Sequence, residues 1–193
     1  FPNAIKKDEK KDKPIDTPPT YRLSSLDVVP DSRIEKRDYK EFPINDSDET
    51  KKEIEDLLKL QKERTKKDEK DIKFEIKAND MLTLFNIDKE EQDNLIEIFK
   101  EITPVVMSIK RTYDRVRPSL LDNRIKPSIE VPGHPAYPSG HSIQCYIAYN
   151  YLKKKYPERE DEFLKIADKI AKNREIAGVH YKSDTKYGKL LAE

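Results

Sequence analysis

The chain has 193 residues, of which 40% are charged and 35% are hydrophobic. That length predicts one domain with a hydrophobic core. The 39 basic and 38 acidic side chains leave a net charge of +1, so no global field favours nucleic acid or an anionic membrane as a partner. Cys145 is the only cysteine, which excludes a fold held together by intrachain disulfides.

The longest apolar run, at residues 102–109, is too short to span a membrane and is interrupted by Pro104. We therefore expect no membrane span. The sequence starts at Phe1 rather than methionine, which is compatible with a removed signal peptide. The compartment stays open between a secreted or periplasmic location and a cytoplasmic one, and a homo-oligomer is compatible with the sequence.

The first 20 residues combine lysine, aspartate and proline with almost nothing to bury. This composition predicts a disordered or extended N-terminal arm at residues 1–20, followed by a helical domain at 21–193.

Helical periodicity begins after this arm. Residues 46–65 predict a first helix that buries Ile54 and Leu57. Residues 70–86 predict a single second helix, with Ile76 and Leu84 among its candidate core positions.

A third helix is predicted at residues 88–102, where Asp88 and Glu91 match a capping box. Residues 104–116 continue the helical pattern, with Pro104 at a kink or a new start. Arg117 precedes a proline and should end this helix.

The proline-rich stretch at 119–138 predicts one long loop, and a loop of that length in a compact domain is usually functional. A helix should follow at 139–156, another should start at Pro157 and end near Gly178, and a last one should occupy part of 180–193. The sequence therefore predicts an all-α bundle.

The first segment with possible chemistry contains Lys110 and Arg117. They are seven residues apart, so on one helix both side chains would leave the same face. Two neighbouring cations repel each other unless an anion lies between them. The alternative is a solvated basic helix.

The second segment, Ser139, Gly140 and His141, lies where the loop enters a helix. Free backbone N–H groups and the positive end of the helix dipole bind anions at such a position. The alternative is an ordinary N-cap serine followed by a surface histidine.

The third segment contains Arg174, His180 and Asp184. Arginine offers a planar fork that matches phosphate oxygens. His180 and Asp184 are four residues apart, so on a helix the carboxylate could accept the Nδ1–H of the imidazole and leave Nε2 as a nucleophile or base. The alternative is a His–Asp pair on a helix surface.

Together, the three segments resemble the signature of the type 2 phosphatidic acid phosphatase superfamily. The matching positions are Lys110, Arg117, Pro118, Pro138, Ser139, Gly140, His141, Arg174, His180 and Asp184. The superfamily includes membrane lipid phosphatases, soluble class A bacterial acid phosphatases and vanadium-dependent haloperoxidases, and the chain is most similar to the soluble class A non-specific acid phosphatases. Asn173 is a departure, because the family usually has serine there.

The resemblance implies a single compact helical bundle of the acid phosphatase/vanadium haloperoxidase type. It also implies a metal-independent phosphomonoester hydrolase that acts on a small-molecule phosphate ester. His180 would be the nucleophile that forms a phosphohistidine, Asp184 would orient it, and His141 would be the general acid. The implied phosphate-binding residues are Lys110, Arg117, Ser139, Gly140 and Arg174. No metal or cofactor is implied, and vanadate is expected to bind as a phosphate mimic.

Three alternatives accompany this interpretation. A vanadate-dependent haloperoxidase would use the same residues, with His180 as the axial ligand of vanadate. A membrane lipid phosphatase is disfavoured by the lack of apolar spans. A non-catalytic phosphate-binding or structural protein is favoured only by Asn173. A general acid that must be protonated further implies an acidic pH optimum.

Overall fold

The computed structural model describes residues 42–193, so the arm predicted at 1–20 lies outside the described residues. The elements in chain order are α1 (Asp48–Glu63), α2 (Lys66–Phe74), α3 (Ala78–Thr83), α4 (Lys89–Tyr113), α5 (Pro118–Leu121), α6 (Gly140–Lys155), the short 3₁₀ helix η1 (Pro157–Arg159), α7 (Glu160–Ile176) and α8 (Lys182–Leu191). No strand occurs within residues 42–193. The predicted all-α fold is confirmed.

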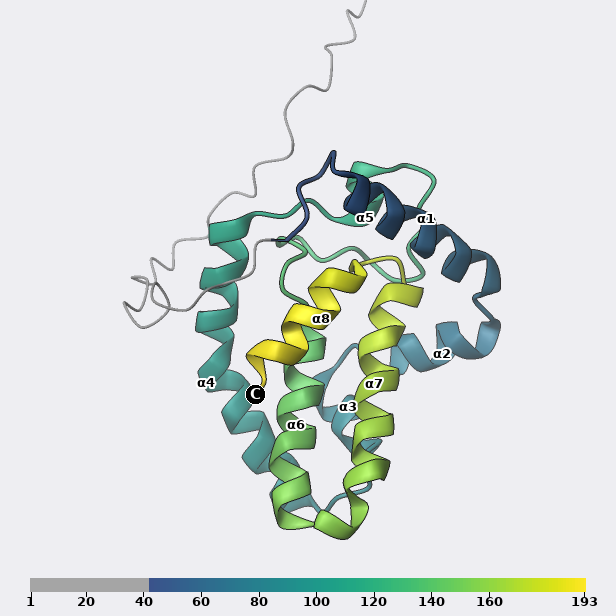
Figure 1. The fold of residues 1–193 in the computed structure, drawn as a ribbon. Coiled ribbons are helices and arrows are strands. Elements are labelled where there is room, and N and C mark those ends of the chain that lie inside the picture. Colours follow the sequence, from purple (N-terminus) through teal and green to yellow (C-terminus); the bar gives the residue numbers. More distant parts are fainter. Residues whose placement is uncertain (1–41) are drawn as a thin grey trace, which may run out of the picture.

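Helices α6 and α7 form the centre of the bundle (Figure 1). They run antiparallel and are joined through η1 at one end of the molecule. Helix α8 packs mainly on α6. In Figure 1 the long helix α4 lies on the side of α6 opposite α7. Helix α1 covers the end of the bundle where α6 and α8 begin.

The largest hydrophobic cluster joins α3, α4, α6 and α7. The inner face of α7 carries four apolar residues that are at most 1% exposed: Phe163, Ala167, Ile170 and Ala171. Each large apolar side chain buried in this way contributes about 1.5–3 kcal/mol of transfer free energy. A smaller cluster forms around Ile54 and Leu57 of α1, as predicted.

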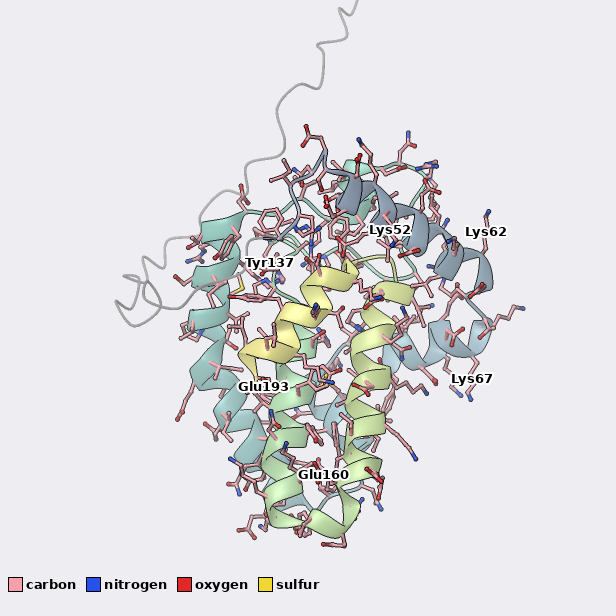
Figure 2. All side chains as sticks on the ribbon, in the orientation of Figure 1. Lys52, Lys62, Lys67, Tyr137, Glu160 and Glu193 are labelled. Carbon is pink, nitrogen blue, oxygen red and sulfur yellow. The ribbon has the colours of Figure 1, made fainter. Side chains whose placement is uncertain are left out.

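The charged side chains that Figure 2 labels point away from the helices. Lys62 and Lys67 extend into solvent, as does Glu160 at the far end of the bundle, whereas Tyr137 lies inside the fold and is 1% exposed. None of the helices within 42–193 is long and apolar enough to cross a membrane.

The single helix predicted at 70–86 is wrong. The chain breaks between α2 and α3, where residues 75–77 leave the helical path. The periodicity that suggested one helix placed Ile76 and Leu84 in the core, but these side chains are 47% and 39% exposed. The break matters for the site, because the backbone at residue 76 contacts a predicted catalytic histidine.

Helix α4 also differs from the prediction. It runs without interruption through Pro104 and ends at Tyr113, because Asp114 adopts a left-handed conformation with φ 42°. The helix therefore stops before Arg117. The predicted capping box is only half formed: Asp88 accepts a hydrogen bond from the Glu91 backbone, while the Glu91 side chain pairs with Lys155.

Two glycines allow the last helix to reach its place. Gly178, between α7 and α8, has φ 75°, a conformation that residues with a Cβ rarely adopt. Gly188 lies so close to α6 that a Cβ would approach the Ser142 Cβ to 2.8 Å and the Ser139 carbonyl oxygen to 2.9 Å. Gly188 thus lets α8 pack closely against the first turn of α6.

Candidate active site

A cavity of about 210 Å³ opens where α4, the loop before α6 and the loop before α8 meet. Its walls are formed by Ile102, Thr103, Val106, Met107, Lys110, Arg117, Pro132, His134, Gly140, His141, Gln144 and His180. Five of the eight predicted site residues therefore share one cavity: Lys110, Arg117, Gly140, His141 and His180. The other three, Ser139, Arg174 and Asp184, lie behind this wall and support it.

His180 presents one ring nitrogen to the cavity side and the other to the protein interior. Its Nδ1 lies 3.2 Å from Asp184 Oδ2, and its Nε2 lies 3.0 Å from the Arg117 Nη1. Because arginine can only donate, Nε2 must be the acceptor and Nδ1 must carry the proton. Burial, together with the charges of Arg117 and Lys110, holds the pKa of His180 well below its ordinary value. The ring is therefore neutral, with the lone pair on Nε2.

Asp184 is fixed by the start of α8 rather than by a shared helical face. His180 precedes this helix, and Tyr181 is its N-cap, so the prediction that His180 and Asp184 stack on one helix is wrong. Asp184 Oδ2 accepts the Tyr181 N–H at 2.9 Å as part of a capping box, and the same oxygen faces His180. The four-residue spacing still brings the two side chains together, but through a helix cap.

Arg117 connects the nucleophile to the loop that precedes α6. Its Nη1 donates to the Val179 carbonyl at 2.7 Å and to His180, while its Nε donates to the His134 carbonyl at 3.0 Å. Its Nη2 lies 3.1 Å from His134 Nδ1. The pKa of His134 is lowered to about 4 by burial and by Lys110 and Arg117. His134 thus lies on the cavity wall.

Lys110 reaches the cavity from α4 and is only 1% exposed. Its ammonium donates to three backbone carbonyls of the loop, those of Pro135, Ala136 and Pro138, at 2.9, 3.3 and 2.5 Å. Burial and the charge of Arg117 hold its pKa well below the ordinary value. The sequence suggested that Lys110 and Arg117 lie on one helix. They do not, because α4 ends at Tyr113, yet both side chains line the same cavity.

The start of α6 forms the floor beneath these cations. Ser139 is the N-cap and accepts hydrogen bonds from the Ser142 N–H and hydroxyl, at 3.3 and 2.9 Å. Its own N–H donates to the Asp184 carbonyl at 3.1 Å, which ties α6 to α8. Gly140 is the first helical residue, and a Cβ there would meet no heavy atom within 4 Å. The predicted helix N-terminus therefore faces the cavity, with Ser139 as its cap.

His141 lies on the first turn of α6. Its Nε2 is 3.1 Å from the Ile76 carbonyl oxygen, so the backbone at the break between α2 and α3 accepts a hydrogen bond from the Nε2–H. Burial and the nearby Arg174 lower the pKa of His141 to about 4, while the contact with the backbone opposes this effect. In this state the ring is neutral at physiological pH.

Arg174 of α7 is 1% exposed and paired with a carboxylate that the sequence did not single out. Its Nη2 donates to Glu75 Oε2 at 2.9 Å and to the Ile72 carbonyl at 3.2 Å. Within residues 42–193 its buried Nε has no hydrogen-bond partner. Asn173, the departure from the family pattern, donates to both Glu75 oxygens at 2.8 and 3.0 Å. Asn173 therefore orients the carboxylate that holds Arg174.

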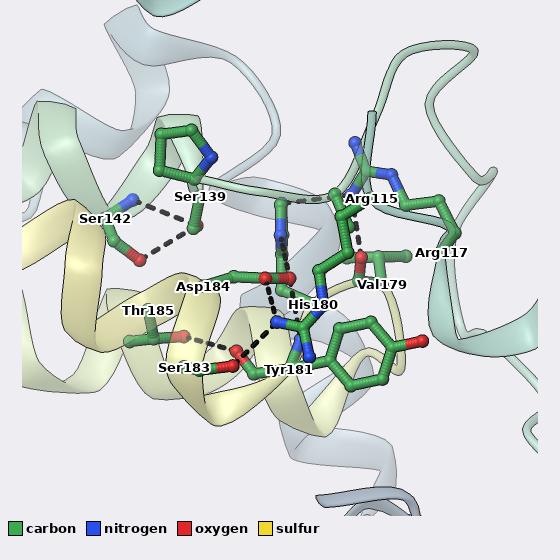
Figure 3. A network of polar contacts seen from close by, with 12 residues as sticks. Arg115, Arg117, Ser139, Ser142, Val179, His180, Tyr181, Ser183, Asp184 and Thr185 are labelled. Atoms are coloured by element: carbon green, nitrogen blue, oxygen red, sulfur yellow. Dashed lines mark hydrogen bonds and ion pairs between the residues drawn. The ribbon is translucent and has the colours of Figure 1, made fainter. Parts of the chain in front are cut away.

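A further buried arginine, Arg115, was not predicted to be part of the site. In the sequence it is one of several cations in a basic segment. It is 0% exposed and donates to Asp184 Oδ1 at 2.6 Å (Figure 3). Glu53 of α1 pairs with the same guanidinium. No local pattern distinguishes Arg115 from Arg111, because only the tertiary fold brings Asp184 and Glu53 beside it.

Among residues 42–193, no group of three or more histidine, cysteine or acidic side chains is arranged to hold a metal ion. The polar groups that converge on the cavity are cationic side chains, imidazoles and a helix N-terminus. This set is suited to a tetrahedral oxyanion.

No protein-family model matches the sequence, and no curated protein matches it. Solved structures do match. A transmembrane PAP2-type phosphatidylglycerolphosphate phosphatase from Bacillus subtilis is similar with a TM-score of 0.53 and 17% identity, over 76% of this chain and 82% of that one. A bacterial vanadium-dependent iodoperoxidase is similar with a TM-score of 0.51 and 17% identity, over 78% of this chain and 49% of that one. The chain thus spans about half of the iodoperoxidase.

The fold is therefore the helical fold of the PAP2-type phosphatases and vanadium haloperoxidases. The predicted helical bundle of the acid phosphatase/vanadium haloperoxidase type is confirmed.

Proposed function

We propose that the chain is a phosphoric monoester hydrolase that acts without a metal through a phosphohistidine on His180. The observation that carries this proposal is the state of His180: its ring is neutral, and its unprotonated Nε2 lies beside Arg117 at a cavity that Lys110 and the start of α6 also border. A phosphoryl transition state spreads negative charge over its equatorial oxygens, so positioned cations and N–H donors stabilise it.

In the first step, the Nε2 lone pair of His180 attacks phosphorus, and the bond from phosphorus to the ester oxygen breaks. His141 in its protonated form gives its proton to the leaving oxygen. Arg117 must release Nε2 for this attack and donates to a phosphoryl oxygen instead. Asp184 keeps the proton on Nδ1 and stabilises the positive charge that the ring gains.

In the second step, water attacks phosphorus and the P–N bond breaks. Neutral His141 accepts a proton from the water, which restores its acid form, and His180 regains its lone pair as phosphate leaves. Lys110, Arg117, Arg174, the N–H groups at the start of α6 and the Ser139 cap hold or support the phosphoryl oxygens throughout. Three cations supply the positive charge that a metal would otherwise supply.

The test is hydrolysis of a chromogenic phosphomonoester by the wild type and by His180→Ala. We expect chelator-resistant turnover that vanadate inhibits, with a loss of at least about 1,000-fold on substitution, because the covalent route disappears. A variant with an altered histidine that lines the same cavity, His134→Gln, should keep most of the activity. Turnover that survives His180→Ala would remove the mechanism.

A haloperoxidase is the second candidate, and the similarity to the iodoperoxidase fold is the observation in its favour. Vanadate would be held by the same cations, with His180 Nε2 as its ligand. The measurement is oxidation of iodide or bromide by peroxide in the presence of vanadate, which we expect to be negligible beside phosphate ester hydrolysis.

A further inference from the structure

The guanidinium of Arg115 is buried where α1, α8 and the segment after α4 meet. Its Nη1 donates to Asp184 Oδ1 and to the Ser183 hydroxyl, both at 2.6 Å, and its Nη2 donates to Glu53 Oε2 at 2.9 Å. Glu53 also accepts the Ser183 N–H at 2.6 Å. One arginine thus joins two carboxylates, and one of these carboxylates faces the nucleophile.

Two aromatic rings lie close to the guanidinium. Its central carbon lies 3.8 Å from the Tyr181 ring centroid and 5.0 Å from that of Phe42. The ring contacts and the two ion pairs, one from each terminal nitrogen, together fix the plane of the group. The two carboxylates, Asp184 first and Glu53 second, outweigh the effect of burial and raise the pKa of Arg115, so it stays charged.

The two oxygens of Asp184 have separate partners, as Figure 3 shows. Oδ2 faces His180 Nδ1 and the Tyr181 N–H, while Oδ1 faces only Arg115 among the hydrogen bonds of the described residues. A carboxylate can rotate about its Cβ–Cγ bond, and rotation here would move Oδ2 out of line with the imidazole. Arg115 holds the opposite oxygen and prevents that rotation.

We propose that Arg115, aligned by Glu53, is a positioning residue for the nucleophile: it fixes the Asp184 carboxylate and thereby the tautomer and orientation of the His180 ring. The inference rests on the proposed function of His180. The hydrogen bonds of Arg115 go to Asp184, Ser183 and Glu53, none of which lines the cavity, so we assign it to act through Asp184 and not on the phosphate. Arginines of a phosphatase site would ordinarily be assigned to phosphate binding, and the two roles have different kinetic consequences.

The experiment compares Arg115→Lys and Glu53→Gln with the wild type in the full chain. Lysine offers one charged nitrogen in place of the two separate guanidinium nitrogens that reach Asp184 and Glu53, so it cannot hold both carboxylates in the same geometry. We expect Arg115→Lys to lower kcat about 10- to 100-fold and to change the Kd of inorganic phosphate, measured by calorimetry, by less than about threefold, as for a group that acts only in the transition state. Glu53→Gln should lower kcat in the same direction by about three- to tenfold, and the double variant should be little worse than Arg115→Lys alone.

The matched control is Arg159→Lys. Arg159 also stacks on an aromatic ring, at 4.6 Å from Phe163, and pairs with Glu162, but it lies at the far end of α7. Its substitution should leave kcat unchanged. A second readout needs no turnover: the ¹⁵N shifts of the His180 ring should report the Nδ1–H form in the wild type and a mixture of tautomers in Arg115→Lys. Glu53→Gln provides the same readout if Arg115→Lys does not fold.

The results distinguish a failure of the proposed function from a failure of the positioning role of Arg115. If the wild type neither hydrolyses esters nor binds phosphate, the proposed function fails, while the ring shifts still test the positioning role. If Arg115→Lys weakens phosphate binding as much as it lowers kcat, Arg115 contacts the anion and the inference is overturned. Unchanged kcat and unchanged ring shifts in folded Arg115→Lys would also overturn it, and would leave Arg115 as a structural link between α1 and α8.

Discussion

The two sides of the cavity differ in how the side chains of the proposed site are paired. On the nucleophile side, both oxygens of Asp184 and both ring nitrogens of His180 have partners within the fold. On the opposite side, Arg174 has a buried Nε with no partner among residues 42–193, and His141 uses its Nε2 on a backbone carbonyl. Arg115, behind Asp184, also has a buried Nε with no partner among these residues, so the contrast concerns Asp184 and His180 on one side and Arg174 and His141 on the other. We expect the opposite side to gain partners when an anion binds.

This difference follows from where the groups lie in the fold. The nucleophile side depends on the N-terminal cap of α8, and Gly188 allows that helix to pack closely against α6. The opposite side depends on the break between α2 and α3, where residues 75 and 76 contact Arg174 and His141. A buried donor without a partner costs about 1–3 kcal/mol. Arg174 lies behind the cavity wall, and we expect its Nε to turn toward an oxygen of a bound anion, which would remove that cost and link anion binding to this side.

The largest expected effect tests whether Arg174 belongs to the anion site. Arg174→Ala should raise the Kd of inorganic phosphate about 10- to 100-fold, since a charged hydrogen bond contributes about 1.5–3 kcal/mol. Glu75→Gln keeps the shape of the partner but removes a negative charge beside Arg174, so it should lower the Kd a few-fold. Both are measured by calorimetry.

Arg64→Ala is the control for these two variants, because Arg64 donates to the carbonyls of Lys126 and Ile176 and does not line the cavity. Its phosphate affinity should equal that of the wild type. If Arg174→Ala also binds phosphate normally, Arg174 is a core residue. Lys110 and Arg117 are then the cationic side chains left in the proposed anion site.

The next effect concerns pH and stability. The three histidines have pKa values lowered in the folded state: His134 and His141 to about 4, and His180 well below its ordinary value. Above the unfolded value of about 6.5 both states are neutral, so these groups change nothing. As the pH falls below that value, the histidines bind protons in the unfolded chain but not in the folded chain. The free energy of unfolding therefore decreases by up to about 1.4 kcal/mol per pH unit for a fully buried histidine.

We therefore expect the Tm to fall between pH 6.5 and pH 4.5, and less steeply in His180→Gln. The partly exposed His134 and His141 should contribute less than His180. Bound phosphate favours protonated imidazole, so its stabilising effect should grow as the pH falls, and the activity should rise over the same range as His141 gains its proton. A Tm shift by phosphate that is larger at pH 7.5 than at pH 5.5 would contradict this coupling.

The smallest effect tests the floor of the cavity. Gly140→Ala should fold as well as the wild type, because a Cβ there meets nothing within 4 Å, but its methyl group would occupy space that an anion needs. We expect the Kd of phosphate to rise about three- to tenfold, or about 0.7–1.4 kcal/mol. Gly133→Ala is the control: a Cβ is equally unobstructed there, and Gly133 does not line the cavity. Equal affinities in both variants would place the anion away from the start of α6.

The sequence was sufficient wherever a local pattern determined the structure. The N-cap at Ser139, the buried face of α7 and the end of that helix before Gly178 all follow from neighbouring residues, and the structure has them. The signature residues indicated which segments should meet. Five of them do share a cavity.

The remainder of the site depends on contacts between distant segments, and local patterns do not encode these. Glu75 becomes a partner of Arg174 only because α2 ends where α7 passes, across 99 positions of sequence. The apolar spacing of Ile76 and Leu84 predicted a continuous helix, yet tertiary packing leaves both exposed. Arg115 differs from its basic neighbours only in what surrounds it. These are the residues that a single sequence cannot separate from ordinary surface charge.

The most direct test of the central claim is a crystal structure of the chain with bound vanadate. We expect vanadium within bonding distance of His180 Nε2, with Arg117 moved from that nitrogen to a vanadate oxygen, Arg174 Nε donating to another oxygen, and His141 beside the oxygen opposite His180. Vanadate bound elsewhere, or a His180 Nε2 still occupied by Arg117 at saturating vanadate, would contradict the account.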